Sequence, residues 1–235
     1  MKNNQLIEAK RQQADKLFDA GKFDEALKIY QELLKKRPKS VALLLGKAQC
    51  LAKLGEIDKA LDILDLIISQ FPDFDIAILF KAQFLMDEDR VQDAIQFLEG
   101  KINSGFNDAE GYALMGELYQ LDDRPILAIT AYNKALGFPT LVDRKSVTNN
   151  LANCYSEISN NKRANEIYDE LLKINPDNVV ALYNKASLLK EKNDSPECLK
   201  ILLRVTKLEP EFLHAWILLG TLYDEMGADL SLIHI

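Results

Sequence analysis

The residue types on which catalysis and metal binding usually depend are scarce in this chain. It has only two histidines, His214 and His234, and no glycine-rich string of the kind that cradles phosphate groups. Its three cysteines, Cys50, Cys154 and Cys198, lack the paired short spacing of a disulfide framework or a zinc site. We expect them to be small buried packing residues. The sequence therefore predicts no enzyme active site, no cofactor and no bound metal.

Long apolar runs and excess positive charge are also lacking. The densest apolar stretch, residues 61–69, is interrupted by Asp62 and Asp65, so no segment predicts a membrane span. Residues 1–10 lack the apolar centre of a signal peptide, and we expect a cytoplasmic protein without membrane insertion. The formal net charge of -7 opposes binding to a phosphate backbone, so nucleic acid is not an expected partner.

What the sequence does contain is a period of 34 residues, with a single step of 36. One column of small residues consists of Ala14, Ala48, Ala82, Gly116, Ala152, Ala186 and Gly220. A second consists of Ala26, Ala60, Ala94, Ala128, Ala164 and Cys198. Small side chains let two helix backbones approach closely, so these columns indicate repeated helix crossings. A fixed period of this length is typical of repeat proteins.

Each period is predicted to fold into two amphipathic helices around a short turn. The breaks are rich in Gly, Asn, Asp and Ser and lie at residues 20–22, 54–56, 87–90, 122–124, 159–161 and 192–194. Prolines that a helix cannot pass through follow four of the second helices, at Pro38, Pro72, Pro176 and Pro210. The chain is therefore predicted to be all-α.

A further column of large side chains consists of Tyr30, Leu64, Leu98, Tyr132, Tyr168 and Leu202. A two-helix unit of 34 residues with these small, aromatic and proline columns resembles the tetratricopeptide repeat over nearly the whole chain. The resemblance implies a right-handed superhelical solenoid of antiparallel helix pairs. A lead-in at residues 1–6 precedes an array over 7–229. Repeats are predicted to begin near Ile7, Val41, Asp75, Ala109, Lys145 and Val179, with a partial seventh at Leu213. Phe106 replaces an expected proline, and the extra two residues lie in 137–145, where we predict a local change in superhelical pitch.

The last residues do not fit the repeat, because 230–235 are mostly apolar and carry no small column. We interpret Ser231 to Ile235 as a non-native tail, read through beyond a truncated gene, in which case the native chain continues. The alternative is a short native tail that packs back on Trp216.

The family resemblance implies that a partner binds along a concave surface lined by the first helices. Candidate contact residues are apolar in the early repeats and polar in the later ones. They are Leu45, Gln49, Ile76, Leu79, Phe80, Gln83, Met86, Glu117, Asn149, Asn153, Asn184 and His214. In the alternative interpretation, Leu45, Leu79 and Phe80 only pack against neighbouring helices.

Asn153 and Asn184 match the two asparagines of the carboxylate clamp by which some members of this family hold chaperone C-termini. The clamp's basic residues are missing, since Asn149, His214 and Leu218 stand in their places. The resemblance therefore favours holding of a peptide backbone by Asn153 and Asn184 over binding of a chaperone tail.

These patterns predict a scaffold or adaptor that binds a protein or peptide segment. The alternative is a non-catalytic portion of a larger, C-terminally truncated protein whose other domain carries an enzymatic or membrane-linked function. The sequence leaves the partner's identity and the oligomeric state open.

Overall fold

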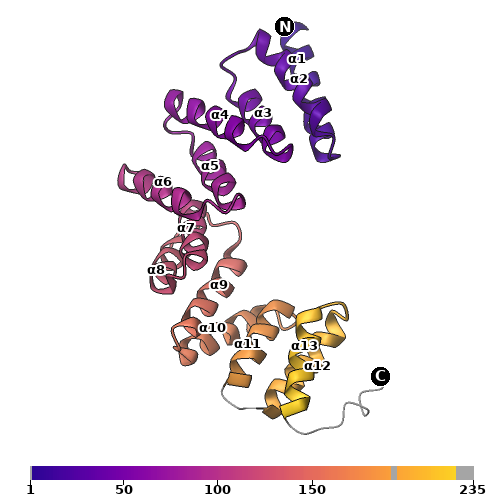
Figure 1. The fold of residues 1–235 in the computed structure, drawn as a ribbon, viewed down its shortest axis with the longest axis vertical. Helices are drawn as coiled ribbons and strands as arrows, with labels where there is room; N and C mark the ends of the chain where they lie inside the picture. The colour runs from indigo at the N-terminus through magenta and orange to yellow at the C-terminus, as the bar shows by residue number, and fades with distance from the viewer. Residues whose placement is uncertain (1, 192–194, 226–235) are drawn as a thin grey trace. The chain divides into compact units, whose positions relative to one another are not determined.

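The computed structural model describes residues 2–191 and 195–225, and all regular secondary structure within them is helical (Figure 1). The helices are α1 (Lys2–Asp19), α2 (Phe23–Lys36), α3 (Val41–Lys53), α4 (Ile57–Gln70), α5 (Asp75–Asp87), α6 (Val91–Asn103), α7 (Ala109–Leu121), α8 (Pro125–Leu136), α9 (Arg144–Glu157), α10 (Asn161–Ile174), α11 (Val179–Glu191), α12 (Ser195–Leu208) and α13 (Leu213–Glu225). The prediction of an all-α protein built from repeated helix pairs is confirmed. The predicted turn at 192–194 and the predicted tail at 230–235 lie outside the described residues.

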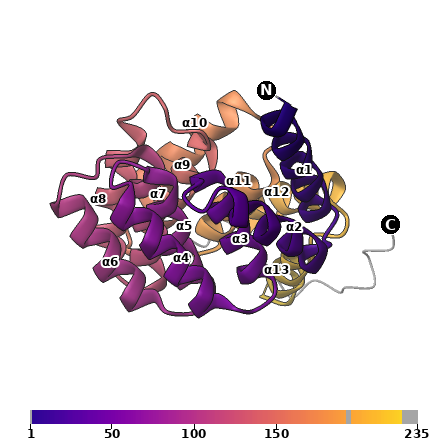
Figure 2. The same ribbon diagram turned by 90° about the horizontal axis from the view of Figure 1, so that it is seen from above.

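The helices form two compact units, residues 1–114 and 115–235, which we describe separately. In the first unit, α1 packs on α2, α3 on α4 and α5 on α6 (Figures 1 and 2). In addition, α2 packs on α3 and α4 on α5, so successive helix pairs are in contact. α3 begins at Val41 and α5 at Asp75, the residues where the period predicts a repeat start. α1 begins at Lys2, so residues 2–6 of the predicted lead-in are helical.

The second unit continues the same arrangement. α9 packs on α10 and α11 on α12, while α9 also contacts α11 and α11 contacts α13, so the first helices of successive repeats are neighbours. The two extra residues lie in the connection between α8 and α9. The Arg144 guanidinium closes this connection by donating to the carbonyl oxygens of Leu136 and Phe138, each at 2.8 Å.

The turns inside the helix pairs share one backbone feature. In the five such turns that the structure describes, a single residue at the same place has a positive φ, between 55° and 79°. These residues are Gly21, Gly55, Asp89, Asp123 and Ser159, and their spacing repeats the period of the sequence. A left-handed residue ends the first helix and lets the chain reverse, which is why the breaks are rich in Gly, Asp and Ser.

The core follows the two small columns. Ala14, Ala48 and Ala82 are fully buried, as are Ala26 and Ala60 of the second column. The prediction that the three cysteines are buried packing residues is confirmed, since all three are fully buried and none is in a disulfide bond. Burial raises the pKa of the Cys50 thiol to about 11 and that of Cys154 to about 12, so both stay neutral at physiological pH.

Two tyrosine rings lie directly on glycines. Tyr30 of α2 packs on Gly46 of α3, and Tyr132 of α8 packs on Gly116 of α7. A Cβ atom at Gly46 would lie 2.5 Å from the Tyr30 ring, and one at Gly116 would lie 2.4 Å from the Tyr132 ring. These glycines are therefore needed for close approach rather than for an unusual backbone conformation.

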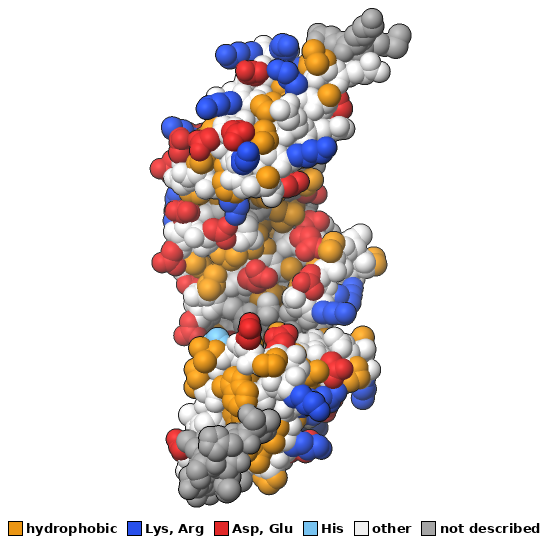
Figure 3. Space-filling view, turned by 90° about the vertical axis from the view of Figure 1, so that its right-hand side faces the viewer, with side chains coloured by type: hydrophobic (Ala, Val, Ile, Leu, Met, Phe, Trp, Pro, Cys, Tyr) orange, Lys and Arg blue, Asp and Glu red, His pale blue; other side chains and the backbone are white. Residues whose placement is uncertain are grey.

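No helix in the described part of the chain combines the length and the apolar character that a bilayer span requires. The surface is rich in charge, and acidic side chains are scattered over the face drawn in Figure 3.

Gly46→Ala tests the close packing. The added methyl group must displace the Tyr30 ring, so we expect the free energy of unfolding to fall by about 1–2 kcal/mol despite the better helix propensity of alanine. Gly100→Ala in α6 is the matched control, because a Cβ there has no neighbour within 4 Å, and it should raise stability by about 0.5–1 kcal/mol. Urea denaturation followed by circular dichroism measures both. Equal effects of the two substitutions would contradict the packing argument.

Candidate functional site

Three of the predicted site residues form one hydrogen-bonded group, the asparagine cluster, made of Asn149 and Asn153 on α9 and Asn184 on α11. The Asn184 Nδ2 donates to the Oδ1 of Asn149 at 3.2 Å and to the Oδ1 of Asn153 at 3.0 Å. The Tyr168 hydroxyl of α10 donates to the same Asn153 Oδ1. Asn149 is 8% exposed, so it acts as an internal support, while Asn153 and Asn184 are half-buried.

The asparagine cluster retains hydrogen-bonding capacity. A side-chain amide offers two donor hydrogens and an acceptor oxygen. Asn184 uses both donors within the cluster and Asn153 uses its oxygen. Among the described residues, the Asn153 Nδ2 and the Asn184 Oδ1 have no partner. One donor and one acceptor thus remain on neighbouring, half-exposed side chains.

A pocket of about 440 Å³ adjoins the cluster. Its lining is mostly polar: Asn153, Ser156, Glu157, Ser159, Tyr168, Asn184, Ser187, Leu188 and Glu191. We call it the asparagine pocket. Burial raises the pKa of the Tyr168 phenol well above its usual range, and the neighbouring Cys154, Glu157 and Glu191 raise it further. The phenol therefore remains a neutral hydrogen-bond donor.

The asparagine pocket does not suit a terminal carboxylate, because its lining contains two glutamates and no basic side chain. His214, at one of the places where the clamp resemblance expects a cation, is exposed and lies against the rings of Tyr183 and Phe212, with centroids 6.3 Å and 5.7 Å away. The structure thus gives no support to chaperone-tail binding.

Glu117, the remaining candidate of the second unit, lies on the last turns of α7 and is half-buried. Burial raises the pKa of its carboxyl group, and the nearby charge of Asp143 raises it further. One helical turn later, Gln120 accepts a hydrogen bond from the Tyr132 hydroxyl at 2.6 Å and donates to the Glu157 carboxylate at 3.3 Å. A polar chain therefore leads from Tyr132 to the asparagine pocket.

In the first unit, the predicted contact residues all keep some exposed surface. Ile76 is 47% exposed, and the other six are half-buried: Leu45, Gln49, Leu79, Phe80, Gln83 and Met86. We call these seven residues the apolar face. Phe80 lies on Phe84 with ring centroids 5.7 Å apart, and Gln83 donates to Asp87 at 2.7 Å. Their side chains therefore pack against neighbours and are also accessible.

Gly46, next to Leu45 on α3, does not belong to this accessible surface. It lies in the core under the Tyr30 ring. The tyrosine of the preceding repeat fills the space there, and the helical register of α3 alone does not reveal this contact.

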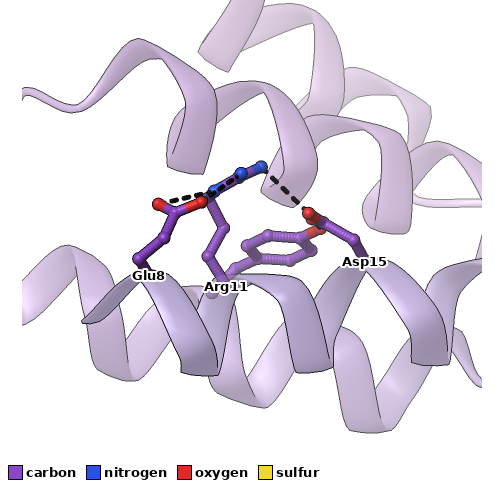
Figure 4. Close-up of polar contacts among 4 residues, drawn as sticks. Glu8, Arg11 and Asp15 are labelled. Atoms are coloured by element: carbon purple, nitrogen blue, oxygen red, sulfur yellow. Dashed lines mark hydrogen bonds and ion pairs between the residues drawn. The ribbon is translucent and has the colours of Figure 1, made fainter. Parts of the chain in front are cut away.

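Sequence analysis missed the polar group around Asp15 on α1, shown in Figure 4. Arg11 pairs with Glu8 at 2.6 Å and with Asp15 at 2.9 Å, and the Tyr30 hydroxyl donates to Asp15 at 2.6 Å. The spacing from Asp15 to Tyr30 equals that from Asn153 to Tyr168. This shared spacing of 15 residues is a signal that could have identified both contacts.

A second pocket, of about 580 Å³, lies between α4, α5 and α6 and contains none of the predicted site residues. Its acidic residues are largely neutralised. Lys81 pairs with Asp65 at 2.5 Å and lies over the Phe97 ring, while Arg90 pairs with Asp93 at 2.7 Å.

Comparison with known proteins agrees with this architecture. Family models described as tetratricopeptide repeat match residues 17–78, 147–178 and 167–200. A tetratricopeptide repeat protein from Parabacteroides merdae is similar in structure, with a TM-score of 0.74, 15% identity, and coverage of 94% of this chain and 87% of that one. The structure of pilF from Pseudomonas aeruginosa is also similar, with a TM-score of 0.73, 16% identity, and coverage of 94% of this chain and 100% of that one.

A third solved structure is YrrB, described as a TPR protein with an unusual peptide-binding site. Its TM-score is 0.64 at 14% identity, with 80% of this chain and 95% of that one covered. No curated protein matches this chain with significant similarity. The chain is built of tetratricopeptide repeats, and its fold is that of solved tetratricopeptide-repeat proteins.

Because the pKa of Glu117 is raised, we expect the stability of the protein to depend on pH through this residue. In the folded state its carboxyl group holds a proton at pH values where the unfolded chain, with a pKa of about 4.3, has lost it. The charged form therefore lowers stability as pH rises above that value. Glu117→Gln should have little effect near pH 4 and should raise the free energy of unfolding at pH 7, as measured by urea denaturation.

Glu170→Gln, at an exposed position on α10, is the control and should show no such pH dependence. If Glu117→Gln changes the free energy of unfolding by the same amount at pH 4 and pH 7, the effect does not come from desolvation of the Glu117 carboxylate.

Proposed function

We propose that this chain binds an extended segment of a protein partner on the accessible faces of its first helices. The observation that carries the proposal is the asparagine cluster, in which Asn153 and Asn184 keep one donor and one acceptor beside an open pocket.

An unused amide donor next to an unused acceptor is complementary to a peptide group, which offers one C=O and one N–H. The Asn149 and Tyr168 contacts hold the two side chains in place before any partner arrives. Binding then orders few groups, so less conformational entropy opposes it. Such contacts recognise the backbone and leave the choice of side chains to the surrounding surface.

The apolar face of the first unit supplies a different kind of contact. Leu79, Phe80 and Met86 are half-buried, so each can cover an apolar side chain of a partner without leaving its own packing. The unbranched side chain of Met86 adapts to partners of different shape. Ile76 adds exposed apolar area on the same helix, α5.

Selection from a display library of random peptides tests the proposal. Wild-type protein should retain a pool of peptides, and Asn184→Ala should weaken their binding about threefold to tenfold through loss of the backbone contact. The Leu79→Glu variant should no longer retain the peptides that contact the apolar face, because their binding would desolvate a carboxylate that has no partner.

Two substitutions away from these surfaces are the controls. Asn133→Ala changes an exposed amide on α8, and Ile174→Glu adds a charge at a side chain that is 76% exposed at the end of α10. Both control variants should retain the same peptides as the wild-type protein. Circular dichroism must show that every variant is folded. The proposal fails if folded Asn184→Ala and Leu79→Glu proteins retain the same peptides as the wild type.

A further inference from the structure

Three first helices of the second unit, α9, α11 and α13, end in glutamate within the described residues. Glu157 is the last residue of α9, Glu191 of α11 and Glu225 of α13, each 34 residues after the one before. A helix C-terminus carries partial negative charge from its unpaired carbonyl groups, so it favours basic side chains and disfavours acidic ones. The contacts of α9 with α11 and of α11 with α13 place these helices next to one another. The arrangement is therefore unfavourable for the isolated protein.

Among the described residues, a cation neutralises one of the three carboxylates, since Lys190 pairs with Glu225 at 3.1 Å. Glu157 accepts one hydrogen bond from the neutral Gln120 amide, at 3.3 Å. Glu191 is exposed and forms no ion pair with any residue that the structure describes. Within the described part of the chain, Glu157 and Glu191 thus have no positive partner.

Both of these carboxylates line the asparagine pocket, together with Asn153, Asn184 and Tyr168. The remaining polar atoms of the lining are hydroxyl groups of serines, which can accept hydrogen bonds. The pocket therefore offers two negative charges and several acceptors, and it has room for a long side chain.

We propose, building on the peptide binding proposed above, that the bound segment is basic and that one of its Lys or Arg side chains enters the asparagine pocket to pair with Glu157 and Glu191. The complementary charge comes from the partner and also offsets the unfavourable position of the carboxylates at two helix ends. An Arg guanidinium, with five donors in a planar fork, fits two carboxylates and the neighbouring hydroxyl groups best.

The spacing on α11 limits where the basic residue lies in the segment. Asn184 and Glu191 are seven residues apart, two helical turns, which corresponds to about 10 Å along the axis at 1.5 Å per residue. An extended segment covers that distance in about three residues. A basic residue within three positions of the peptide group held by the asparagines therefore reaches Glu191.

The test uses the full chain and the same display library of random peptides. Wild-type protein should enrich peptides that contain Lys or Arg over the starting library. Binding of a selected, fluorescently labelled peptide should weaken about tenfold in a Glu157→Gln/Glu191→Gln double variant, measured by fluorescence anisotropy. Because the substitutions remove charge from the unfavourable ends of helices, the double variant should be at least as stable as the wild type.

A Glu170→Gln/Glu209→Gln double variant is the matched control. It loses the same charge from exposed positions on α10 and in the connection between α12 and α13, and should change the affinity less than about twofold, since distant surface charges are screened. Equal weakening in the two double variants would show attraction to net charge alone and would overturn the inference.

The two proposals fail in different ways. In one outcome, the wild-type protein retains peptides whose binding depends on Asn184, but the peptides are not enriched in Lys or Arg and bind the Glu157→Gln/Glu191→Gln variant equally well. This outcome overturns the basic-segment inference and leaves the proposal of peptide binding intact. Failure of the wild-type protein to retain any peptide overturns both.

Discussion

The close approach of helix backbones at columns of small residues is the constraint on which the structure depends. Ala14, Ala48 and Ala82 of the first column have no exposed surface, and the same is true of Ala26 and Ala60 of the second. Each helix pair is thereby held at short distance, and the larger Leu and Tyr side chains fill the space around the crossings. Stability in such proteins is close to a sum over neighbouring repeats, so the same contact matters at each step.

This packing also creates the candidate binding surface. The tyrosines that fill the space around the crossings extend their hydroxyl groups towards polar residues on the first helices. Tyr30 reaches Asp15 and Tyr168 reaches Asn153, so the core orients the side chains of the surface. Asn184 completes the group from the next repeat, which means that the asparagine cluster exists only because α9 and α11 are adjacent. Glu157 and Glu191 lie in the lining of the same pocket, and the basic segment proposed above would place a positive charge beside them.

The fold could be predicted from the sequence because its determinants are local and repeated. The small columns, the turn residues such as Gly55 and Asp123, and the burial of the cysteines all follow from the period. The candidate site could be predicted only in part. The period of the sequence predicts that Asn153 and Asn184 lie on first helices. Their hydrogen bond depends on the distance between α9 and α11, and the sequence period does not define that distance. The position of the Tyr30 ring over Gly46 and the pairing of Lys190 with Glu225 also depend on side chains from neighbouring repeats.

The proposed contact of Asn153 and Asn184 with the backbone of a bound segment can be followed through the side-chain amide signals of asparagines in an NMR titration. On addition of a peptide selected by the wild-type protein, we expect the side-chain signals of Asn153 and Asn184 to shift and the signal of Asn133 on α8 to stay in place. If the signals of Asn153 and Asn184 stay unchanged at saturating peptide, these two side chains do not hold the segment.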